Sequence, residues 1–263
     1  MAEKRFAGKV ALVTGGTSGI GRAVAHAFAR EGADVVVAGR RAERGDAVVR
    51  ELAGLDARAL FVAADVSRAR DVESLVDRTL ERFGRLDCAS NNAGSLEAGV
   101  FKATADFEES EFDGHLALNL KSVWLCMKQE IAAMVRQGGG AIVNTSSVNG
   151  LGGVAMNALY ATAKAGALAL TKSAAQEYAR QGVRVNALVA GAFRTPMLEG
   201  VFDRLSPGDA PAAEATYAQM VPLGRIGRPA EAAEAVLWLC SEAASYVTGH
   251  SMIVDGGMTA PYR

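Results

Sequence analysis

The sequence predicts a single α/β domain built on a doubly wound parallel sheet with helices on both faces. Short apolar runs rich in β-branched residues alternate with longer Ala-rich amphipathic stretches along the 263 residues. This alternation is the pattern of βαβ units around a buried sheet. Glycines fall at the ends of these segments rather than in a linker, and no internal repeat divides the chain. We therefore expect one domain over residues 1–263.

Seven runs have the length and residue types of buried strands, and six stretches have helical periodicity. The expected strands are 10–14, 34–38, 58–62, 86–90, 141–145, 183–189 and 252–254. The expected helices are 22–31, 42–53, 71–83, 112–137, 158–180 and 230–240. Residues 195–222, which contain SPGDAPAAEA, break this rhythm. Long loops in compact domains commonly cover binding sites, so we expect an irregular lid over the active site there.

The composition excludes several classes of function. Half of the residues are hydrophobic, 22% are charged and the formal net charge is -1, which describes a globular protein without the basic surplus of a nucleic-acid or membrane partner. Cys88, Cys126 and Cys240 lie in apolar runs without ligand spacing, so we expect buried, reduced thiols and no metal site. The first residues, MAEKRFAGKVALVTGG, lack the continuous apolar stretch of a secretion signal, and no later segment has the run of about 18 apolar residues that a membrane span needs. A cytoplasmic location is expected.

A glycine-rich loop, TGGTSGIG from Thr14, follows the first expected strand and opens the first helix. In that position glycines permit a tight turn, and the backbone can approach a pyrophosphate at the positive end of a helix. A chain with 29 glycines also produces such spacings by chance, and the loop is not the strict GxGxxG fingerprint. The dinucleotide interpretation gives cofactor contacts to Gly15, Thr17, Ser18, Gly19, Ile20 and Gly21.

The end of the second expected strand, VVVAGRR, bears on the choice of cofactor. The acidic residue that would bind the ribose 2′-hydroxyl of NAD is absent. Gly39 leaves space, while Arg40 and Arg41 supply charge-assisted hydrogen bonds suited to a 2′-phosphate. The sequence favours NADP(H) and leaves NAD(H) possible, because the same arginines can simply solvate the start of a helix.

Two more strand ends supply candidate cofactor contacts. Asp65 and Val66 follow the third strand and could lie beside an adenine, although Asp65 could equally cap a helix. Asn92, Ala93 and Gly94 follow the fourth strand and are small and polar where a sheet edge meets a flat cofactor. In isolation, this second segment could be only an Asn/Gly turn.

Tyr160 and Lys164 are four residues apart in a helical segment, so their side chains share one face. A neighbouring ammonium stabilises a phenolate and draws a tyrosine pKa from about 10 toward neutrality. Ser147, at the carboxyl end of a buried strand, could polarise the same carbonyl oxygen. A hydrolase nucleophile is the rival role, but Ser147 has no G-x-S-x-G elbow. The three histidines have no triad-like setting and are interpreted as structural or surface residues.

Several motifs in this order resemble the short-chain dehydrogenase/reductase family. They are TGGTSGIG, NNAG, the Ser147, Tyr160, Lys164 spacing within SSVNGLGGVAMNALYATAK, VRVNALVAGAFRTPM, and PLGRIGRPAEAAEAVLWLCSEAASYVTGHSMIVDGG. The resemblance covers nearly the whole chain, from about residue 8 to residue 257. It implies a Rossmann-type domain with an Asn-Ser-Tyr-Lys active site and an NAD(P)(H) cofactor.

The resemblance implies roles that the residues alone do not. Asn119, in HLALNLKSV, would be the fourth catalytic residue and hold a water that links the catalytic lysine to solvent. Gly191 and Thr195 would contact the nicotinamide side of the cofactor, with Thr145 below the ring. The family usually has Pro-Gly after the sixth strand, where this chain has Ala190 and then glycine, which predicts a less rigid loop.

Together these residues predict an oxidoreductase that interconverts a secondary alcohol and a ketone. The resemblance and the chemistry of these side chains imply that hydride would pass between substrate and nicotinamide and that Tyr160 would transfer the proton. Ser147 would orient the oxygen, and Lys164 would hold the ribose and lower the tyrosine pKa. One alternative is a 3-oxoacyl-[acyl-carrier-protein] reductase, which needs a basic docking patch. Candidates for such a patch are Lys128, Arg136, Lys172 and Arg180. A more distant alternative is a non-catalytic dinucleotide-binding sensor.

Apolar residues in and around the expected lid indicate a small, uncharged, moderately apolar substrate, or simply the underside of a closed loop. They are Leu96, Leu151, Val154, Met156, Met197, Leu198, Phe202, Leu205, Tyr217 and Met220. The resemblance also implies a homotetramer in which the helices 112–137 and 158–180 pair across a two-fold axis. The Ala-rich second helix suits such close packing.

Overall fold

The computed structural model describes residues 4–96 and 101–260. They form a seven-stranded sheet in the order β3-β2-β1-β4-β5-β6-β7, with every neighbouring pair parallel. The strands are β1 (Val10–Thr14), β2 (Asp34–Gly39), β3 (Ala59–Ala63), β4 (Cys88–Asn91), β5 (Gly140–Ser147), β6 (Val183–Ala190) and β7 (Ser251–Val254). The order reverses between β1 and β4, which is the switch point of a doubly wound, Rossmann-type sheet. The predicted fold and its seven strands are confirmed.

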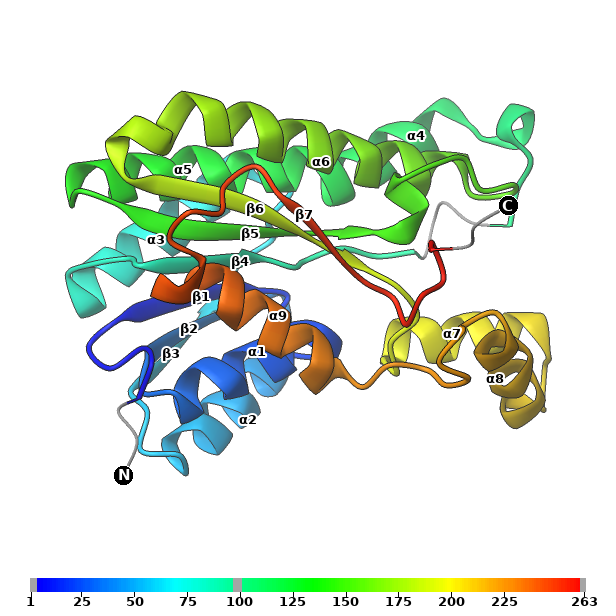
Figure 1. The fold of residues 1–263 in the computed structure, drawn as a ribbon, viewed down its shortest axis with the longest axis horizontal. Helices are drawn as coiled ribbons and strands as arrows, with labels where there is room; N and C mark the ends of the chain where they lie inside the picture. The colour runs from blue at the N-terminus through cyan, green and yellow to red at the C-terminus, as the bar shows by residue number, and fades with distance from the viewer. Residues whose placement is uncertain (1–3, 97–100, 261–263) are drawn as a thin grey trace.

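Helices cover both faces of the sheet (Figure 1). One layer holds α1 (Gly19–Arg30), α2 (Ala42–Ala53) and α9 (Pro229–Cys240), and the other holds α3 (Ala69–Phe83), α5 (Ser122–Arg136) and α6 (Ala158–Tyr178). The helix α4 (Glu109–Leu116) precedes α5, while α7 (Pro196–Leu205) and α8 (Ala210–Gln219) lie beyond the carboxyl ends of the strands. Of the described helices, none is long and apolar enough to cross a membrane.

The core follows from the alternation of side chains along each strand. In β2, Val35 and Val37 pack with α1 and α9 on one face, while Val36 and Ala38 pack with α3 and α5 on the other. Successive strand side chains point to opposite faces, so a strand covered on both sides must be apolar throughout. Burying each valine side chain contributes about 1.5–3 kcal/mol. The predicted buried, unpaired state of the three cysteines is also confirmed.

Two helix predictions were wrong in instructive ways. The first is the continuous helix expected over 112–137. It begins earlier, because the Glu108 backbone N–H donates to the Glu111 carboxylate (2.9 Å) in a capping box, and it is interrupted by a π-helical turn over Ala117–Lys121. The π turn inserts one extra residue and shifts the side chains that follow.

The second is the stretch 195–222, which is not irregular but forms α7 and α8. Thr195 caps α7 by accepting a hydrogen bond from the Leu198 N–H (3.3 Å), and Asp209 caps α8 by accepting from the Ala212 N–H (3.1 Å). Each cap is followed by a proline in the first helical turn. Proline has no backbone N–H, but the N–H groups of a first helical turn have no partner within the helix. These prolines therefore start helices rather than break them.

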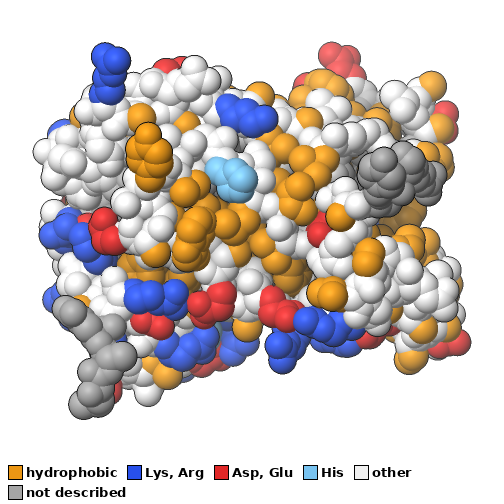
Figure 2. All heavy atoms as spheres, viewed as in Figure 1, with side chains coloured by type: hydrophobic (Ala, Val, Ile, Leu, Met, Phe, Trp, Pro, Cys, Tyr) orange, Lys and Arg blue, Asp and Glu red, His pale blue; other side chains and the backbone are white. Residues whose placement is uncertain are grey.

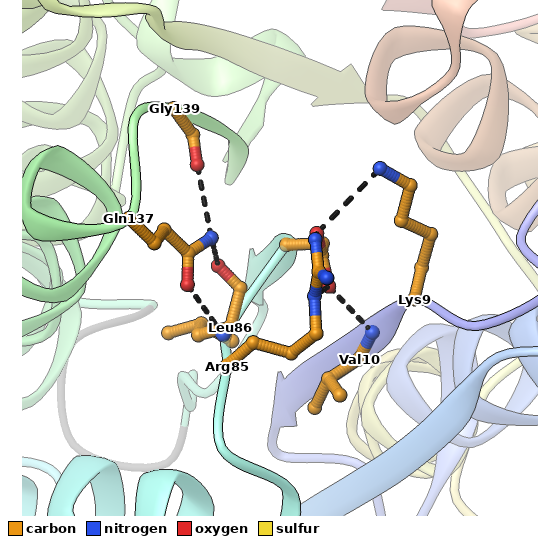
Figure 3. Close-up of polar contacts among 7 residues, drawn as sticks. Lys9, Val10, Arg85, Leu86, Gln137 and Gly139 are labelled. Carbon is orange, nitrogen blue, oxygen red and sulfur yellow. Dashed lines mark hydrogen bonds and ion pairs between the residues drawn. The ribbon is translucent and has the colours of Figure 1, made fainter.

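The amino ends of the central strands are fastened by a polar network that we call the amino-edge cluster (Figure 3). Its members are Lys9, Val10, Arg85, Leu86, Asp87, Gln137 and Gly139. The buried Asp87 carboxylate accepts hydrogen bonds from the Val10 N–H (2.9 Å) and the Arg85 guanidinium (2.7 Å). The Gln137 side chain accepts from the Leu86 N–H (3.0 Å) and donates to the Leu86 carbonyl (2.7 Å). This cluster joins β1, β4 and the turn before β5 at the edge away from the site described next.

Candidate active site

A cavity of about 450 Å³ opens at the carboxyl ends of β1, β2, β4, β5 and β6. It brings together most of the residues that the sequence analysis selected. These are Gly15, Thr17, Ser18, Gly19, Ile20, Arg40, Arg41, Asp65, Val66, Asn92, Ala93, Gly94, Thr145, Ser147, Tyr160, Lys164, Gly191 and Thr195. Two selected residues, Gly21 and Asn119, lie behind the lining rather than in it.

The glycine-rich loop is packed too closely for side chains. A Cβ on Gly21 would lie 2.4 Å from the Gly15 carbonyl oxygen, and a Cβ on Gly15 would lie 2.9 Å from Ala93 Cα. Thr14 ties the two loops together, because its Oγ1 accepts hydrogen bonds from the N–H groups of Asn92 (3.1 Å) and Ala93 (3.2 Å). The close packing therefore leaves room only for glycine at these two positions.

The first turn of α1 is electrostatically suited to an anion. Ser18 occupies the N-cap position without a capping hydrogen bond, and no acidic residue lies in the first turn. The unpaired N–H groups and the positive end of the helix dipole then face the cavity. Such a cradle fits the pyrophosphate of a dinucleotide cofactor.

The end of the cavity beside β2 and β3, where the sequence analysis expected the adenosine and which we call the adenosine end, carries both positive and negative side chains. Arg40 and Arg41 are exposed at its rim, beside Gly39. Asp65 accepts hydrogen bonds from the Ser67 N–H (3.1 Å) and hydroxyl (2.7 Å), and the hydroxyl contact is the main influence that lowers the pKa of Asp65. Asp65 thus fastens the turn before α3 and lines the cavity, but it is not the helix cap that the alternative proposed, because the N-cap of α3 is Arg68.

Ser147, Tyr160 and Lys164 meet at the inner end of the cavity. Ser147 is the last residue of β5, and its Oγ accepts a hydrogen bond from the Asn149 N–H (3.2 Å). Its hydroxyl also lies close enough to the Tyr160 hydroxyl to lower the pKa of the phenol in part. The Lys164 ammonium, with only 4% of the residue exposed, donates to the Thr145 carbonyl (2.9 Å). The predicted convergence of the serine, tyrosine and lysine is therefore observed.

Burial sets the protonation of this group, and its direction differs from the expectation. Burial raises the pKa of Tyr160 to about 12, and the Ser147 hydroxyl lowers it only in part. Burial lowers the pKa of Lys164 to about 8. The ammonium lies 5.5 Å from the centre of the tyrosine ring and is hydrogen-bonded to a backbone carbonyl. The protein alone therefore keeps the phenol protonated at neutral pH.

Asn119 lies in the π turn and is 1% exposed. Its side-chain amide donates to the His115 carbonyl (3.2 Å), and its Oδ1 accepts from the Ser95 N–H (3.0 Å). A Cβ on Gly94 would lie 2.8 Å from this Oδ1 and 3.5 Å from Lys164 Nζ. Asn119 therefore holds the loop after β4 close to the lysine.

The loop after β6 is anchored on both sides, despite the alanine at its start. The Gly191 N–H donates to the Val254 carbonyl (3.0 Å), and the Arg194 N–H donates to the Gly227 carbonyl (2.8 Å). A Cβ on Gly191 would lie 2.6 Å from Asp255 Cα. The Thr195 side chain packs against the glycine-rich loop, 3.1 Å from the position of a Cβ on Gly19. The loop is thus held in place without the proline that the family usually has.

A buried polar network lies behind the site. The Asn91 amide donates to the Glu130 carboxylate (2.9 Å) and to Asn144 Oδ1 (3.0 Å), and the Asn144 amide donates to the Thr171 hydroxyl (2.9 Å). Burial raises the pKa of Glu130 to about 7, while its hydrogen bond from Asn91 lowers it. The network links α5 to β4, β5 and α6, which all carry site residues.

Three residues that lie beside the candidate catalytic side chains were not predicted from the sequence. Thr14 was signalled by a hydroxyl in an otherwise apolar strand, and Asn149 by its position two residues after Ser147. His115, interpreted as structural or surface, is 3% exposed and packs edge-on against the Tyr160 ring, with 6.0 Å between ring centres. Burial lowers the pKa of His115, so the imidazole is neutral at neutral pH. No local pattern could have revealed a contact between two helices.

The opposite end of the cavity, where the sequence analysis expected the substrate and which we call the substrate end, is apolar. Among the described residues, its charged lining is confined to Lys164, while Asn149 and Asn157 supply amides. The apolar lining comes from the loops after β4 and β5 and from α7 and α8: Leu96, Phe101, Val148, Val154, Met156, Met197, Leu198, Val201 and Tyr217. This lining suits an uncharged substrate of moderate size.

Comparison with known proteins finds relatives of nearly equal length. A family model described as enoyl-(acyl carrier protein) reductase matches residues 15–259. The 2,5-dichloro-2,5-cyclohexadiene-1,4-diol dehydrogenase of Sphingobium indicum is 43% identical over 256 residues, covering 97% of this chain and 98% of that protein. The cis-4-hydroxycyclohexanecarboxylate dehydrogenase of Sinomonas cyclohexanicum is 43% identical over 255 residues, with 97% and 98% covered. The crystal structure of levodione reductase has a TM-score of 0.94 and 40% identity, and the match covers 98% of this chain and 100% of that one.

Proposed function

Because the chain belongs to the short-chain dehydrogenase/reductase family and is an oxidoreductase of secondary alcohols and ketones, we propose that it interconverts uncharged cyclic alcohols and ketones with NADP(H). The observation that carries this proposal is the convergence of Ser147, Tyr160 and a buried Lys164 at the inner end of an apolar cavity. The nicotinamide would supply or accept the hydride.

The chain's own residues would handle the proton and the substrate oxygen. Tyr160 is protonated at neutral pH, so it is ready to donate to the oxygen of a ketone as that oxygen becomes an alcohol. Ser147 would hold the same oxygen by a hydrogen bond. Lys164 would bind the cofactor ribose and favour the phenolate in the oxidation direction, and Asn119 would hold the water that connects the lysine to solvent. Thr145, whose buried Oγ1 has no partner among the described residues, would support the nicotinamide.

NADP(H) is favoured over NAD(H) by the rim of the adenosine end. Gly39 ends β2 without a carboxylate, and Arg40 and Arg41 are exposed at the rim, where Arg40 also helps to lower the pKa of Asp65. A planar guanidinium suits a 2′-phosphate geometrically as well as electrostatically. The remaining cofactor contacts would come from the glycine-rich loop, the loops after β3 and β4, and the loop after β6.

The names of the relatives support a ring-shaped substrate, and the cavity lining indicates that this ring is uncharged. Two relatives are named for six-membered rings that carry a hydroxyl, one of them with a carboxylate as well. No described cation other than Lys164 lines the substrate end here, and a buried carboxylate without a partner is costly. We therefore propose neutral cyclic ketones or diols, with α7 and α8 acting as the lid.

The acyl-carrier-protein alternative is less well supported. Arg136 is the last residue of α5 and Arg180 lies just beyond α6, which runs about 27 Å from Tyr160 to its last residue. Lys128 and Lys172 lie along the same helices rather than at the cavity mouth. An acidic carrier would need cations around the mouth. The sensor alternative gives no role to the buried Lys164 or to the Ser147 and Tyr160 hydroxyls that lie beside it.

A homotetramer is proposed on two exposed apolar faces. One is a groove between α5 and α6, lined by Leu120, Trp124 and Leu170. The other surrounds β7 and α9, where Figure 2 shows hydrophobic side chains gathered at the centre of the face and where Trp238 and Ile253 are exposed. Two distinct faces suit a dimer of dimers.

A cytoplasmic location is proposed because the three cysteines are unpaired.

The decisive experiment measures NADPH oxidation with three ketones: cyclohexanone, 4-oxocyclohexanecarboxylate and a straight-chain ketone of similar size. We expect cyclohexanone to be reduced, with the carboxylate at least about 10-fold poorer in kcat/KM because its charge would be buried unpaired. Nicotinamide binding without turnover of any ketone would instead support the sensor.

Light scattering should give four times the 27.3 kDa chain mass, and a monomer at micromolar concentration would refute the tetramer.

A further inference from the structure

Two bulky residues at the substrate end adopt a backbone conformation that disfavours them. Among the described residues, three that are not glycine have positive φ: Asp56 (59°), Phe101 (68°) and Met156 (62°). A Cβ crowds the backbone in this left-handed region, which is rare for bulky side chains. The Phe101 N–H donates to the Met156 carbonyl (2.7 Å), so the two strained residues are bonded to each other.

The strain is not compensated by burial. Phe101 is 42% exposed and Met156 is 48% exposed, although both line the cavity. Large apolar side chains contribute to folding in proportion to the area they remove from water. Two such residues that are both strained and half exposed contribute little to stability, and strain of this kind collects at binding sites.

Their position points to the substrate rather than to the cofactor. The hydrogen bond joins the loop after β4 to the loop before α6, whose first turns carry Tyr160. Val154 and Met197, 41% and 40% exposed, line the same end of the cavity. The exposed apolar side chains therefore line the part of the cavity where a substrate would lie.

We propose that Phe101 and Met156 determine substrate specificity by forming a preorganised wall against which an uncharged ring packs. This inference deepens the proposed function and rests on it. The left-handed backbone holds both side chains at the site before substrate arrives, so their ordering does not have to be achieved on binding. Substrate would then cover the apolar surface that folding left exposed. The neighbouring Asn157, whose buried Oδ1 has no partner among the described residues, offers an acceptor for a hydroxyl on the same ring.

The test replaces each strained residue by glycine, which adopts positive φ without strain. Phe101→Gly and Met156→Gly should keep or raise the melting temperature, yet lower kcat/KM for cyclohexanone by about 10- to 100-fold, mainly through KM. For butan-2-one, which covers less of the wall, the loss should stay below about 3-fold. The Kd for NADPH should not change. Asp56→Gly is the matched control, because Asp56 is left-handed but does not line the cavity, and it should change only stability.

Three results would overturn the proposal. Glycine variants that lose stability and affect all ketones equally would show that the residues are structural. Variants that change the mass in light scattering without changing ring-to-chain selectivity would show that the wall contacts another subunit. Selectivity unchanged within about 2-fold in a stable, active variant would show that the substrate lies elsewhere. A wild type that reduces no ketone contradicts the proposed function, whereas an active wild type with insensitive variants contradicts this inference alone.

Discussion

The two edges of the sheet differ in whether their polar side chains have hydrogen-bond or ion-pair partners. At the amino edge, the Asp87 carboxylate and the Gln137 amide have hydrogen-bond partners on both of their polar atoms. At the carboxyl edge, the described residues include a buried threonine hydroxyl without a partner and a buried lysine without a carboxylate. Unsatisfied groups and strain persist only where the rest of the fold is stable enough to hold them. The difference indicates that stability is concentrated at one edge and chemistry at the other.

The largest effect should come from removing one oxygen at the carboxyl edge. Tyr160→Phe should lower kcat by about 10²- to 10⁴-fold, because the proton donor is lost. The melting temperature and the Kd for NADPH should change little, since the ring and its contacts are kept. Tyr178→Phe, the same change at the far end of α6, is the control and should leave kcat unaltered. Wild-type turnover in Tyr160→Phe would show that the proton comes from another group.

The next largest effect should appear at the amino edge, in stability alone. Asp87→Ala removes the acceptor of the Val10 N–H and of the Arg85 guanidinium. The free energy of unfolding, measured with urea, should fall by about 2–4 kcal/mol, with kcat within about twofold of wild type. Asp77→Ala, an exposed change on α3, should alter neither. A large loss of kcat in a folded Asp87→Ala would mean that the two edges are coupled.

A third experiment examines the network between the edges through its pH dependence. The pKa of Glu130 is raised from 4.5 to about 7, so between these values the folded state binds more protons than the unfolded one. The free energy of unfolding should therefore fall as pH rises through this window, by at most about 3 kcal/mol. Glu130→Gln should flatten that slope in melting temperatures measured from pH 5 to pH 8. Glu177→Gln, exposed on α6, should keep it; an equal slope in both variants would exclude Glu130 as its source.

The smallest effect should arise at the exposed rim of the cavity. Arg40→Ala should lower the NADP(H)-to-NAD(H) ratio of kcat/KM by about 10-fold, the lower end for a lost charge-assisted hydrogen bond, because solvent screens this site. The drop should shrink further in 0.5 M salt. Arg44→Ala, exposed on α2 and outside the cavity lining, should leave the ratio unchanged. A native preference for NAD(H) would show that Arg40 points to solvent.

The parts that sequence predicted are those determined by local pattern. The strands were found because a sheet covered on both faces demands continuous apolar runs, such as 35–37 in β2. Ser147, Tyr160 and Lys164 were found because strand ends and helical spacing bring them to one place. The helices α7 and α8 were missed because Pro196 and Pro211 were interpreted as part of an irregular segment rather than as first-turn residues.

Features that depend on contacts between distant segments were not predictable. The edge-on contact of His115 with Tyr160 depends on how α4 packs against α6. The left-handed conformation of Met156 has no signal either, because such positions are expected at glycine or asparagine. The raised pKa of Tyr160 reflects burial, which spacing alone does not measure.

The π turn before α5 restricts which mutations this segment can accept. A π turn holds one residue more than a regular helical turn. Deleting one residue of Ala117–Lys121 would let the turn relax to a regular helix, and the Asn119 side chain would lose its place between the Ser95 N–H and the His115 carbonyl. In a mutagenesis library, this segment should therefore accept substitutions at the exposed Lys121 but few deletions.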